Sequence, residues 1–195
     1  MKPKQAAIFL DRDGTIIEEV GYLKSTKRIR LIPRAAESIK MLKNFGFKIV
    51  VVSNQSGVAR GYFDESIVRI VNEEIIKIFL ENDAPIDAIY YCPHHPQYGL
   101  EKDRHCDCRK PKTGMLFKAV NDLNIDLNKS VIIGDKRTDV ETGNNLGITS
   151  ILVLTGFGKH EYAKIVAEGK PKPDYVVENI YKAAQYIQKN FKLNS

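Results

Sequence analysis

The sequence predicts an α/β fold: a single doubly wound domain in which helices cover both faces of a mainly parallel sheet. Three observations support this fold class. Strand-like and helix-like segments alternate along the chain. The strand-like segments are short and almost continuously apolar, as expected of strands that are buried on both faces. With 195 residues and no internal repeat, the chain is expected to form one domain with an ample core over residues 1–195.

The first elements are predicted from apolar runs and from residues that start or stop helices. Residues 6–10 (Ala-Ala-Ile-Phe-Leu) and 48–52 (Lys-Ile-Val-Val-Val) are expected to form buried strands. A helix is expected over residues 33–44, with Pro33 in its first turn and Gly46 ending it.

The later elements continue the alternation. A long helix is expected over residues 64–80, because its apolar residues recur at helical spacing and Asp64 can cap it. The glycine-rich segment 156–159 lacks the spacing and the hydroxyl residue of a phosphate-binding loop, so it is interpreted as an ordinary loop. The remaining strands are expected at 86–91, 131–133, 151–154 and 175–177, and the remaining helices at 113–123 and 180–191.

The segment Asp11-Arg12-Asp13-Gly14-Thr15 follows directly on the first predicted strand. Ligands bind at the carboxyl ends of the strands in open α/β sheets. Residues i and i+2 of an extended segment point the same way, so Asp11 and Asp13 are expected to converge, with Gly14 turning the chain after them. Two close carboxylates favour a hard cation such as Mg²⁺, acid–base chemistry, or both. The alternative is that Asp-Gly is only a turn.

Three further segments place polar groups near this edge. Ser53 and Asn54 open a polar segment after the second strand, and Asp135 and Asp139 follow the fourth. Lys110 precedes a predicted helix, where a lysine can hold an anion together with the helix N-terminus. Each has a simpler interpretation: a polar loop, a helix cap formed by Asp139 or Thr138, and a solvated lysine. Together they supply what phosphoryl transfer needs, namely positioning and charge neutralisation.

The four segments resemble, in order, the four motifs of the haloacid dehalogenase (HAD) superfamily: Asp-x-Asp-Gly-Thr, Ser, Lys and Gly-Asp-x-x-x-Asp, between residues 11 and 139. The resemblance implies a Rossmann-like HAD domain and phosphatase chemistry. It makes Asp11 the nucleophile that forms an aspartyl-phosphate, and Asp13 the general acid and base. An Asp at this second position marks phosphatases in the superfamily.

The resemblance also implies roles for the other motif residues. Ser53 and Lys110 would hold the transferred phosphoryl oxygens. The catalytic Mg²⁺ would be bound by Asp11, Asp135 and the backbone carbonyl of Asp13. Asp139 would support that metal shell or help to place Lys110.

All three cysteines of the chain lie within residues 92–108. Cys92 and His94 form C-x-H, and Cys106 and Cys108 form C-x-C, which offers three thiolates and one imidazole for a closed, structural Zn²⁺ site in a loop over about residues 92–110. The alternative is three free cysteines and a surface histidine. His95 and His105 are rival ligands, and the C-x-H pattern of the relatives described next favours His94.

A narrower resemblance is carried by residues 54–63, the Cys/His set and residues 108–115. They are similar to the D-glycero-D-manno-heptose-1,7-bisphosphate 7-phosphatase family and to its sister group, the histidinol-phosphate phosphatase domains. The resemblance implies Mg²⁺-dependent hydrolysis of the 7-phosphate of a heptose bisphosphate, a small phosphorylated sugar. Lys112 and Thr113 replace part of the family's loop pattern, which bears on substrate choice.

The chain has no room for a large cap domain, so specificity is expected to come from loops. These are residues 14–27, the loop 54–61 with Arg60, and Arg109. Asn54 is a candidate substrate ligand, and Arg60 and Arg109 are candidates for holding the second phosphate or the sugar hydroxyls.

Composition restricts the other function classes. No apolar run approaches the ~20 residues that span a membrane, and no signal-peptide core is present, so a cytoplasmic location is expected. The net charge of +6 is spread along the chain, without a basic patch interleaved with aromatic residues, so nucleic acid is not an expected partner and a monomer is expected. The open alternatives are a histidinol-phosphate phosphatase and, less favoured, a nucleic-acid-end phosphatase.

Overall fold

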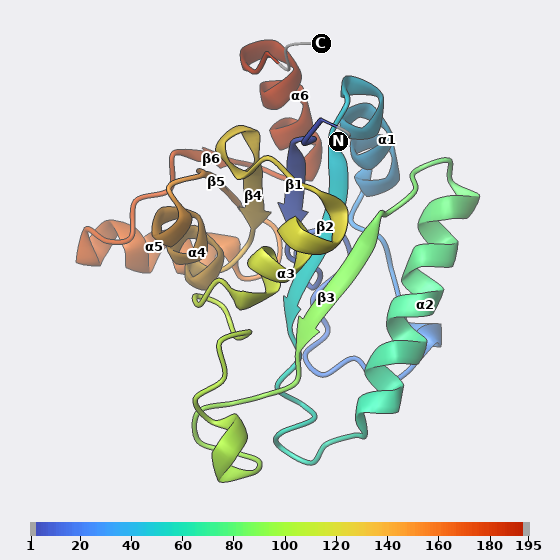
Figure 1. Ribbon diagram of the computed structural model, residues 1–195, viewed down its shortest axis with the longest axis vertical. Coiled ribbons are helices and arrows are strands. Elements are labelled where there is room, and N and C mark those ends of the chain that lie inside the picture. The colour runs from blue at the N-terminus through green and yellow to red at the C-terminus, as the bar shows by residue number, and fades with distance from the viewer. Residues whose placement is uncertain (1–2, 193–195) are drawn as a thin grey trace.

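The computed structural model describes residues 3–192, which form a six-stranded sheet with helices on both faces (Figure 1). Every strand pair is parallel, and the strand order is β3-β2-β1-β4-β5-β6. The central strand β1 pairs with β2 and β4, so that Leu10 lies beside Val51 and Ile133. The strands are β1 (Ala7–Leu10), β2 (Lys48–Asn54), β3 (Ala88–Cys92), β4 (Val131–Gly134), β5 (Thr149–Val153) and β6 (Tyr175–Val177).

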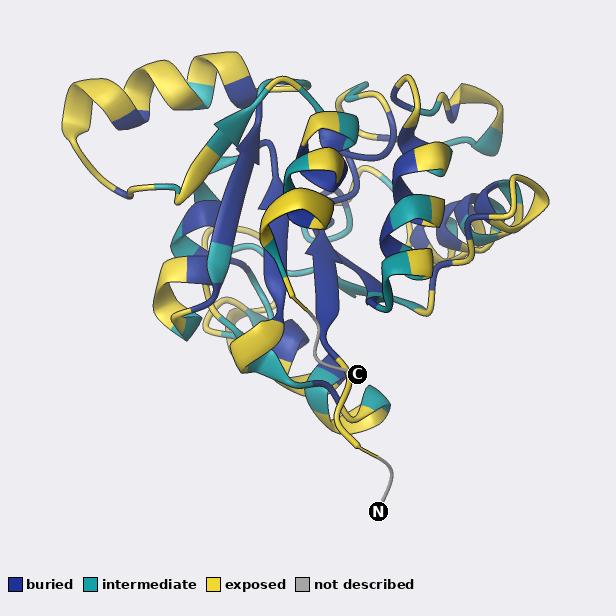
Figure 2. Ribbon diagram, turned by 90° about the horizontal axis from the view of Figure 1, so that it is seen from above, coloured by how far each residue is buried: buried dark blue, intermediate teal, exposed yellow. Residues whose placement is uncertain are grey.

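The two faces of the sheet are covered by different helices. Alternate side chains of β1 enter different cores: Ile8 and Leu10 pack with α1, α2 and α6, whereas Ala7 and Phe9 pack with α3. A smaller cluster joins α4 and α5 to the outer strands β5 and β6. Figure 2 shows buried strands at the centre and exposed outer faces on the helices. The helices are α1 (Ala35–Phe45), α2 (Glu65–Glu81), α3 (Gly114–Leu123), α4 (Arg137–Leu146), α5 (Gly158–Glu168) and α6 (Ile180–Asn190), with short 3₁₀ helices at Thr26–Arg28, Glu101–Asp103 and Leu127–Lys129.

The predicted doubly wound α/β domain is confirmed, and the predicted strands lie within two residues of the observed ones. Gly46 ends α1 as expected: its φ is 110°, and its backbone N–H bonds the carbonyls of Leu42 and Lys43. The helix starts later than predicted, at Ala35, after Arg34 adopts a left-handed φ of 64°.

The interpretation of residues 156–159 as a loop is wrong for its second half. Gly158 begins helix α5. Only Gly158 and Ile165 of this helix are buried, so it carries almost no apolar periodicity by which it could be predicted. The region after β4 also needs correction, because the N-cap position of α4 is Lys136 and not Thr138 or Asp139. Asp139 contributes to the cap from within the first turn, where its Oδ2 accepts the backbone N–H of Lys136 at 3.0 Å.

The described residues contain one α/β unit and no large cap domain. The segment between β3 and α3 extends away from the sheet and contains most of the Cys/His set (Figure 1). No helix within residues 3–192 is long and apolar enough to span a bilayer.

Candidate functional site

The carboxyl ends of β1 and β4 bring three buried carboxylates together. Asp11 follows β1, and its backbone N–H donates to Ile133 O at 2.9 Å, which fixes it beside β4. Carboxylate oxygens of Asp11, Asp135 and Asp139 lie within 4.8 Å of one another, and all three residues are buried. The predicted meeting of the first and fourth strand ends is therefore observed, and like charges at this spacing favour nearby cations or protonation of one carboxyl group.

Lys110 supplies one of these cations. Its Nζ donates to Asp11 Oδ1 at 2.8 Å, to Asp139 Oδ1 at 2.6 Å and to Val52 O at 2.6 Å. Burial alone would lower the pKa of Lys110, but the charges of Asp11 and Asp139 outweigh it and the pKa is raised. Likewise burial would raise the pKa of Asp11, but Lys110 and Lys136 hold it below its usual range. Asp11 is thus ionised and Lys110 charged at neutral pH.

Asp135 is placed to bind a cation. Its Oδ2 accepts a hydrogen bond from the backbone N–H of Phe157 at 2.8 Å, whereas its buried Oδ1 has no hydrogen-bond partner among the described residues. Burial, with the nearby charges of Asp11 and Asp139, raises the pKa of Asp135 to about 8. An orphaned buried carboxylate oxygen beside two further carboxylates is a donor set that suits a hard divalent ion such as Mg²⁺.

The backbone leaves no spare volume beside Asp135 Oδ2. Gly14 has a φ of 84°, and a Cβ added there would lie 2.2 Å from Asp135 Oδ2. Gly156, on the loop after β5, is equally close, with its Cβ position 2.3 Å from the same oxygen. Both positions therefore require glycine for close approach and for φ.

Asp13 does not join the carboxylate cluster, so the expected convergence of its side chain with Asp11 on one spot is not observed. Its carboxylate is held by Arg12, through Nε to Oδ2 at 3.0 Å and Nη2 to Oδ1 at 3.1 Å, and by Gln55 Nε2 at 2.9 Å. The reason is local: β1 ends at Leu10 and Gly14 turns the chain, so the alternation of an extended strand does not apply to these residues.

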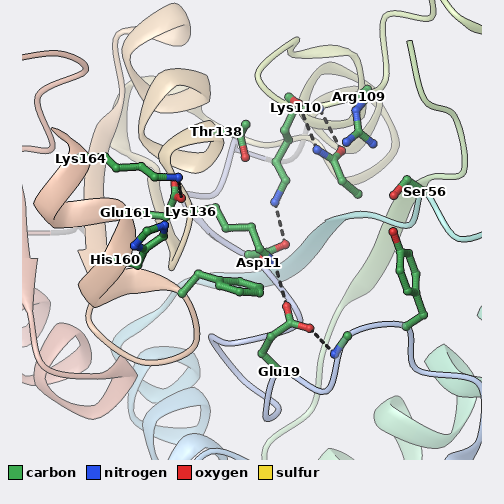
Figure 3. Close-up of a pocket in the computed structure, with 14 residues that line it drawn as sticks. Asp11, Glu19, Ser56, Arg109, Lys110, Lys136, Thr138, His160, Glu161 and Lys164 are labelled. Atoms are coloured by element: carbon green, nitrogen blue, oxygen red, sulfur yellow. Dashed lines mark hydrogen bonds and ion pairs between the residues drawn. The ribbon is translucent and has the colours of Figure 1, made fainter. Parts of the chain in front are cut away.

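Above the carboxylates lies a cavity of about 590 Å³ (Figure 3). Asp11 and Lys110 form its floor. On one side it is lined by Arg109 and Ser56, and on the opposite side by the α5 residues His160 and Lys164. Asn54 also lines the cavity and holds the backbone of Lys110: its Nδ2 donates to Lys110 O at 3.0 Å and its Oδ1 accepts from Lys110 N at 3.0 Å. The other lining residues are Glu19, Gly21, Tyr22, Lys136, Thr138, Phe157 and Glu161.

Lys136 is a site residue to which the sequence interpretation gave no role. Its Nζ lies 3.5 Å from Asp11 Oδ2, 3.3 Å from Glu19 Oε2 and 3.9 Å from Asp135 Oδ1. Burial would lower the pKa of Lys136, but the surrounding carboxylates outweigh this effect and the pKa is raised. A role for Lys136 could have been predicted from its position directly after Asp135 at a strand end. Gln55 was missed in the same way, and its Nε2 also donates to Ser53 Oγ at 2.7 Å.

The predicted Cys/His set converges beside this edge. Cys108 Sγ lies 2.9 Å from Cys92 Sγ and 3.3 Å from His94 Nδ1, and Cys92 Sγ lies 3.6 Å from Cys106 Sγ. Ligand atoms of all four residues lie within 4.8 Å of one another, and the cysteines form no disulfide. Three sulfurs and one imidazole nitrogen at this spacing suit a tetrahedral metal such as Zn²⁺.

The hydrogen bonds among these ligands perturb the thiols. The bond to Cys92, with those to Cys106 and His94, lowers the pKa of Cys108 to about 5, although burial opposes the change. His95, a rival ligand in the sequence interpretation, is instead engaged with Arg60, 3.0 Å from its Nε2.

The two arginines proposed for substrate binding lie in different places. Arg109 lines the cavity, and its Nη1 donates to the backbone oxygen of His94 at 3.0 Å. Arg60 is not among the cavity-lining residues: its guanidinium stacks on Tyr98, 4.2 Å from the ring centroid, and contacts His95. These two aromatic side chains hold Arg60 on the Cys/His loop, and a contact between Arg60 and substrate stays a prediction.

Comparisons with known proteins agree with this geometry. The HAD-hydrolase-like family profile matches residues 107–183. The chain is 39% identical to the D-glycero-β-D-manno-heptose-1,7-bisphosphate 7-phosphatase of Haemophilus influenzae over 175 residues, 89% of this chain and 92% of that protein. It is 40% identical to the protein of the same name from Escherichia coli K12, over 95% of both chains.

Solved structures give the same result. A D,D-heptose 1,7-bisphosphate phosphatase from B. bronchiseptica, complexed with magnesium and phosphate, superposes with a TM-score of 0.83 at 29% identity. The match covers 94% of this chain and 98% of that one. A putative HAD-like phosphatase from Mesorhizobium loti has a TM-score of 0.80, also at 29% identity, over 100% of this chain and 91% of that one.

Proposed function

Because this chain belongs to the HAD-type phosphatase family of the heptose-1,7-bisphosphate 7-phosphatases, we propose that it is a Mg²⁺-dependent phosphatase that removes the 7-phosphate of D-glycero-D-manno-heptose 1,7-bisphosphate. One observation supports the chemistry above all others. An ionised Asp11 lies on the floor of the cavity, paired with Lys110 at 2.8 Å, beside the orphaned oxygen of Asp135.

In the proposed mechanism Asp11 attacks the phosphorus atom and the sugar oxygen leaves. The low pKa of Asp11 keeps the nucleophile unprotonated at neutral pH. Lys110 holds Asp11 in place and brings its positive charge next to the phosphoryl oxygens, to which Ser53 donates a hydrogen bond. Lys136, within 3.5 Å of Asp11, adds a second cation to neutralise the charge that develops there.

The metal site fits this scheme. Asp11 and Asp135, with the backbone carbonyl of Asp13, would hold Mg²⁺, which when bound supplies charge neutralisation at the phosphoryl group. Asp139 plays a supporting part, because its two oxygens are occupied by Lys110 Nζ and by the backbone N–H of Lys136. Asp139 therefore positions the lysine rather than the metal.

Asp13 completes the reaction. It donates a proton to the leaving sugar oxygen as the P–O bond breaks, and Asp11 becomes an aspartyl-phosphate. It then takes a proton from the water that attacks this phosphorus, which restores Asp11 and releases phosphate.

The walls of the cavity suit an anionic substrate. Arg109 is our candidate for holding the second phosphate or the sugar hydroxyls, because its fork of donors faces the cavity while Nη1 is anchored on His94. Zn²⁺ in the Cys/His set would fix the loop that carries Arg109. Two carboxylates also line the cavity, but Glu19 pairs with Lys136 and Glu161 with Lys164, so neither is left free for the ammonium group of histidinol phosphate.

The test is Mg²⁺-dependent phosphate release, with kcat/KM measured for both anomers of heptose 1,7-bisphosphate and for histidinol phosphate. We expect a strong preference for one heptose anomer. The Asp11→Asn variant is the control and should release no phosphate above trace levels while remaining folded. A preference for histidinol phosphate would move the chain to the sister group. Release only from 5′- or 3′-phosphorylated oligonucleotides would support the nucleic-acid-end alternative and overturn the proposal.

A further inference from the structure

We propose that Arg12 is a positioning residue that orients the carboxylate of Asp13 for proton transfer. The proposal rests on the phosphatase function proposed above, in which Asp13 is the acid and base. Arg12 occupies the variable position between the two aspartates of the motif, and neither the sequence interpretation nor the mechanism gives it a task.

Arg12 is a charged side chain in an unusual place. It is 1% exposed and is the largest fully buried side chain among the described residues. Burying a guanidinium costs several kcal/mol unless it is paired and hydrogen-bonded. All three of its nitrogens are satisfied: Nε and Nη2 by Asp13, as described, and Nη1 by Asn72 Oδ1 at 2.8 Å. A long arginine held on every nitrogen forms a rigid support for the group that it contacts.

The support comes from a separate part of the fold. Asn72 is a buried residue of α2, 60 positions along the chain from Arg12. The guanidinium is therefore held against a helix on one side and contacts both carboxylate oxygens on the other, with Nη2 3.0 Å from Oδ2 and 3.1 Å from Oδ1. Contacts from two guanidinium nitrogens to both oxygens restrict the position and orientation of a carboxylate.

The same contacts distinguish the two oxygens of Asp13. Oδ2 accepts from both Arg12 Nε and Gln55 Nε2, whereas Oδ1 accepts a single hydrogen bond, from Arg12 Nη2 at 3.1 Å, among the described residues. A carboxylate oxygen has two lone pairs, so Oδ1 is the oxygen with capacity to carry the transferred proton. Gln55 also contacts Ser53 Oγ, which ties the acid to a residue that would hold the phosphoryl group.

The proposal makes a selective prediction about leaving groups. An alkyl phosphate such as the heptose needs a proton on its leaving oxygen, whereas p-nitrophenolate leaves without one. In Arg12→Lys the charge is kept but the contacts from two guanidinium nitrogens are lost. We expect kcat for heptose bisphosphate to fall by about 30-fold or more, within the usual contribution of acid–base catalysis. The single-turnover burst of p-nitrophenolate should change less than about threefold, because that step needs no acid.

A double-mutant cycle separates positioning from general structural damage. In an Asp13→Asn background, Arg12→Lys should add less than about a twofold further loss, because the group that it positions is already disabled. An equal loss on both substrates, or a full additional loss in the Asp13→Asn background, would overturn the proposal.

Two further variants complete the experiment. Asn72→Ala removes the hydrogen bond that supports Arg12 and leaves both Arg12 and Asp13 in place. It should show a smaller loss of the same kind, greater for heptose bisphosphate than for p-nitrophenyl phosphate. It replaces Arg12→Lys in the experiment if that variant does not fold. Arg34→Lys is the matched control, because Arg34 makes an exposed fork with Glu37 at 2.7 Å and lies outside the site. It should leave the leaving-group dependence unchanged. Absence of phosphate release from the unsubstituted enzyme would instead contradict the proposed function itself.

Discussion

Arg109 donates from Nη1 to the backbone oxygen of His94 at 3.0 Å, which links the Cys/His cluster to the cavity above Asp11. His94 provides one of the four candidate metal ligands, and Arg109 follows another, Cys108, directly in sequence. The loop that would be closed by a metal therefore ends on the side chain that faces the proposed substrate. Loss of the metal should weaken substrate binding more than it slows the chemical step.

Removal of the metal proposed for the Cys/His set gives the first prediction. Zinc binding can contribute on the order of 10 kcal/mol to the folding of such a loop. In Cys106→Ser, or after chelation, we expect KM for the bisphosphate to rise about tenfold or more and Tm to fall, because Arg109 loses its anchored position. The residual activity should still require Mg²⁺. Turnover supported by zinc in the absence of Mg²⁺ would contradict a structural role.

The second prediction concerns Lys110, whose Nζ bridges Asp11 and Asp139. Replacing it with methionine leaves the buried Asp139 carboxylate without its ion pair and leaves Asp11 with Lys136 alone, both near Asp135. Breaking a buried pair in this way costs about 3–5 kcal/mol, so Lys110→Met should lose both stability and activity in denaturant and kinetic measurements.

Added Mg²⁺ should recover part of the lost stability of Lys110→Met, since a cation can return to the carboxylates. Lys118→Met is the matched control, because Lys118 makes an exposed pair with Asp122 on α3 and such pairs contribute about 1 kcal/mol or less. Equal stability of the two variants would contradict a stabilising ion pair of Lys110 with Asp11 and Asp139.

Much of this site could be predicted from the sequence, for a physical reason. Asp11, Ser53 and Asp135 each lie at a strand's carboxyl end, and parallel strands bring those ends to one edge. The Cys/His set was predictable because all three cysteines cluster in sequence.

Contacts that depend on tertiary packing could not be predicted. The orientation of Asp13 depends on Asn72 of α2, and the position of Arg60 depends on how His95 and Tyr98 of a distant loop pack against it. Helix α5 could not be predicted because its buried residues are only Gly158 and Ile165. One buried apolar side chain cannot show the repeating spacing that identifies a helix.

The third prediction follows from the raised pKa of Asp135, about 8 against 3.8 for the ordinary group. Between these values the folded state holds a proton that the unfolded state has released. Stability of the metal-free protein should therefore fall as pH rises from about 4 to about 8, and level off above. In Asp135→Asn this part of the slope should vanish.

The matched measurement is Tm against pH with and without Mg²⁺. We expect Mg²⁺ to flatten the profile of the unsubstituted protein, because the ion stabilises the ionised form of Asp135. A metal-free slope that is the same in both proteins would show that the Asp135 carboxyl is not protonated in the folded state.

The last prediction separates the two arginines. Arg109 faces the cavity, whereas Arg60 is held by Tyr98 and His95 away from it. Arg109→Ala should lower kcat/KM for the heptose bisphosphate about 10- to 100-fold relative to the heptose 7-monophosphate, because a charge-assisted bond to the second phosphate contributes about 1.5–3 kcal/mol.

Arg60→Ala is the matched control and should keep the ratio of the two kcat/KM values within about twofold, because the arginine does not reach the cavity. It should lower Tm, since Arg60 joins the loop after β2 to the Cys/His loop. Loss of the bisphosphate preference in Arg60→Ala, with the preference retained in Arg109→Ala, would reverse the assignment and show that the loop rearranges around substrate.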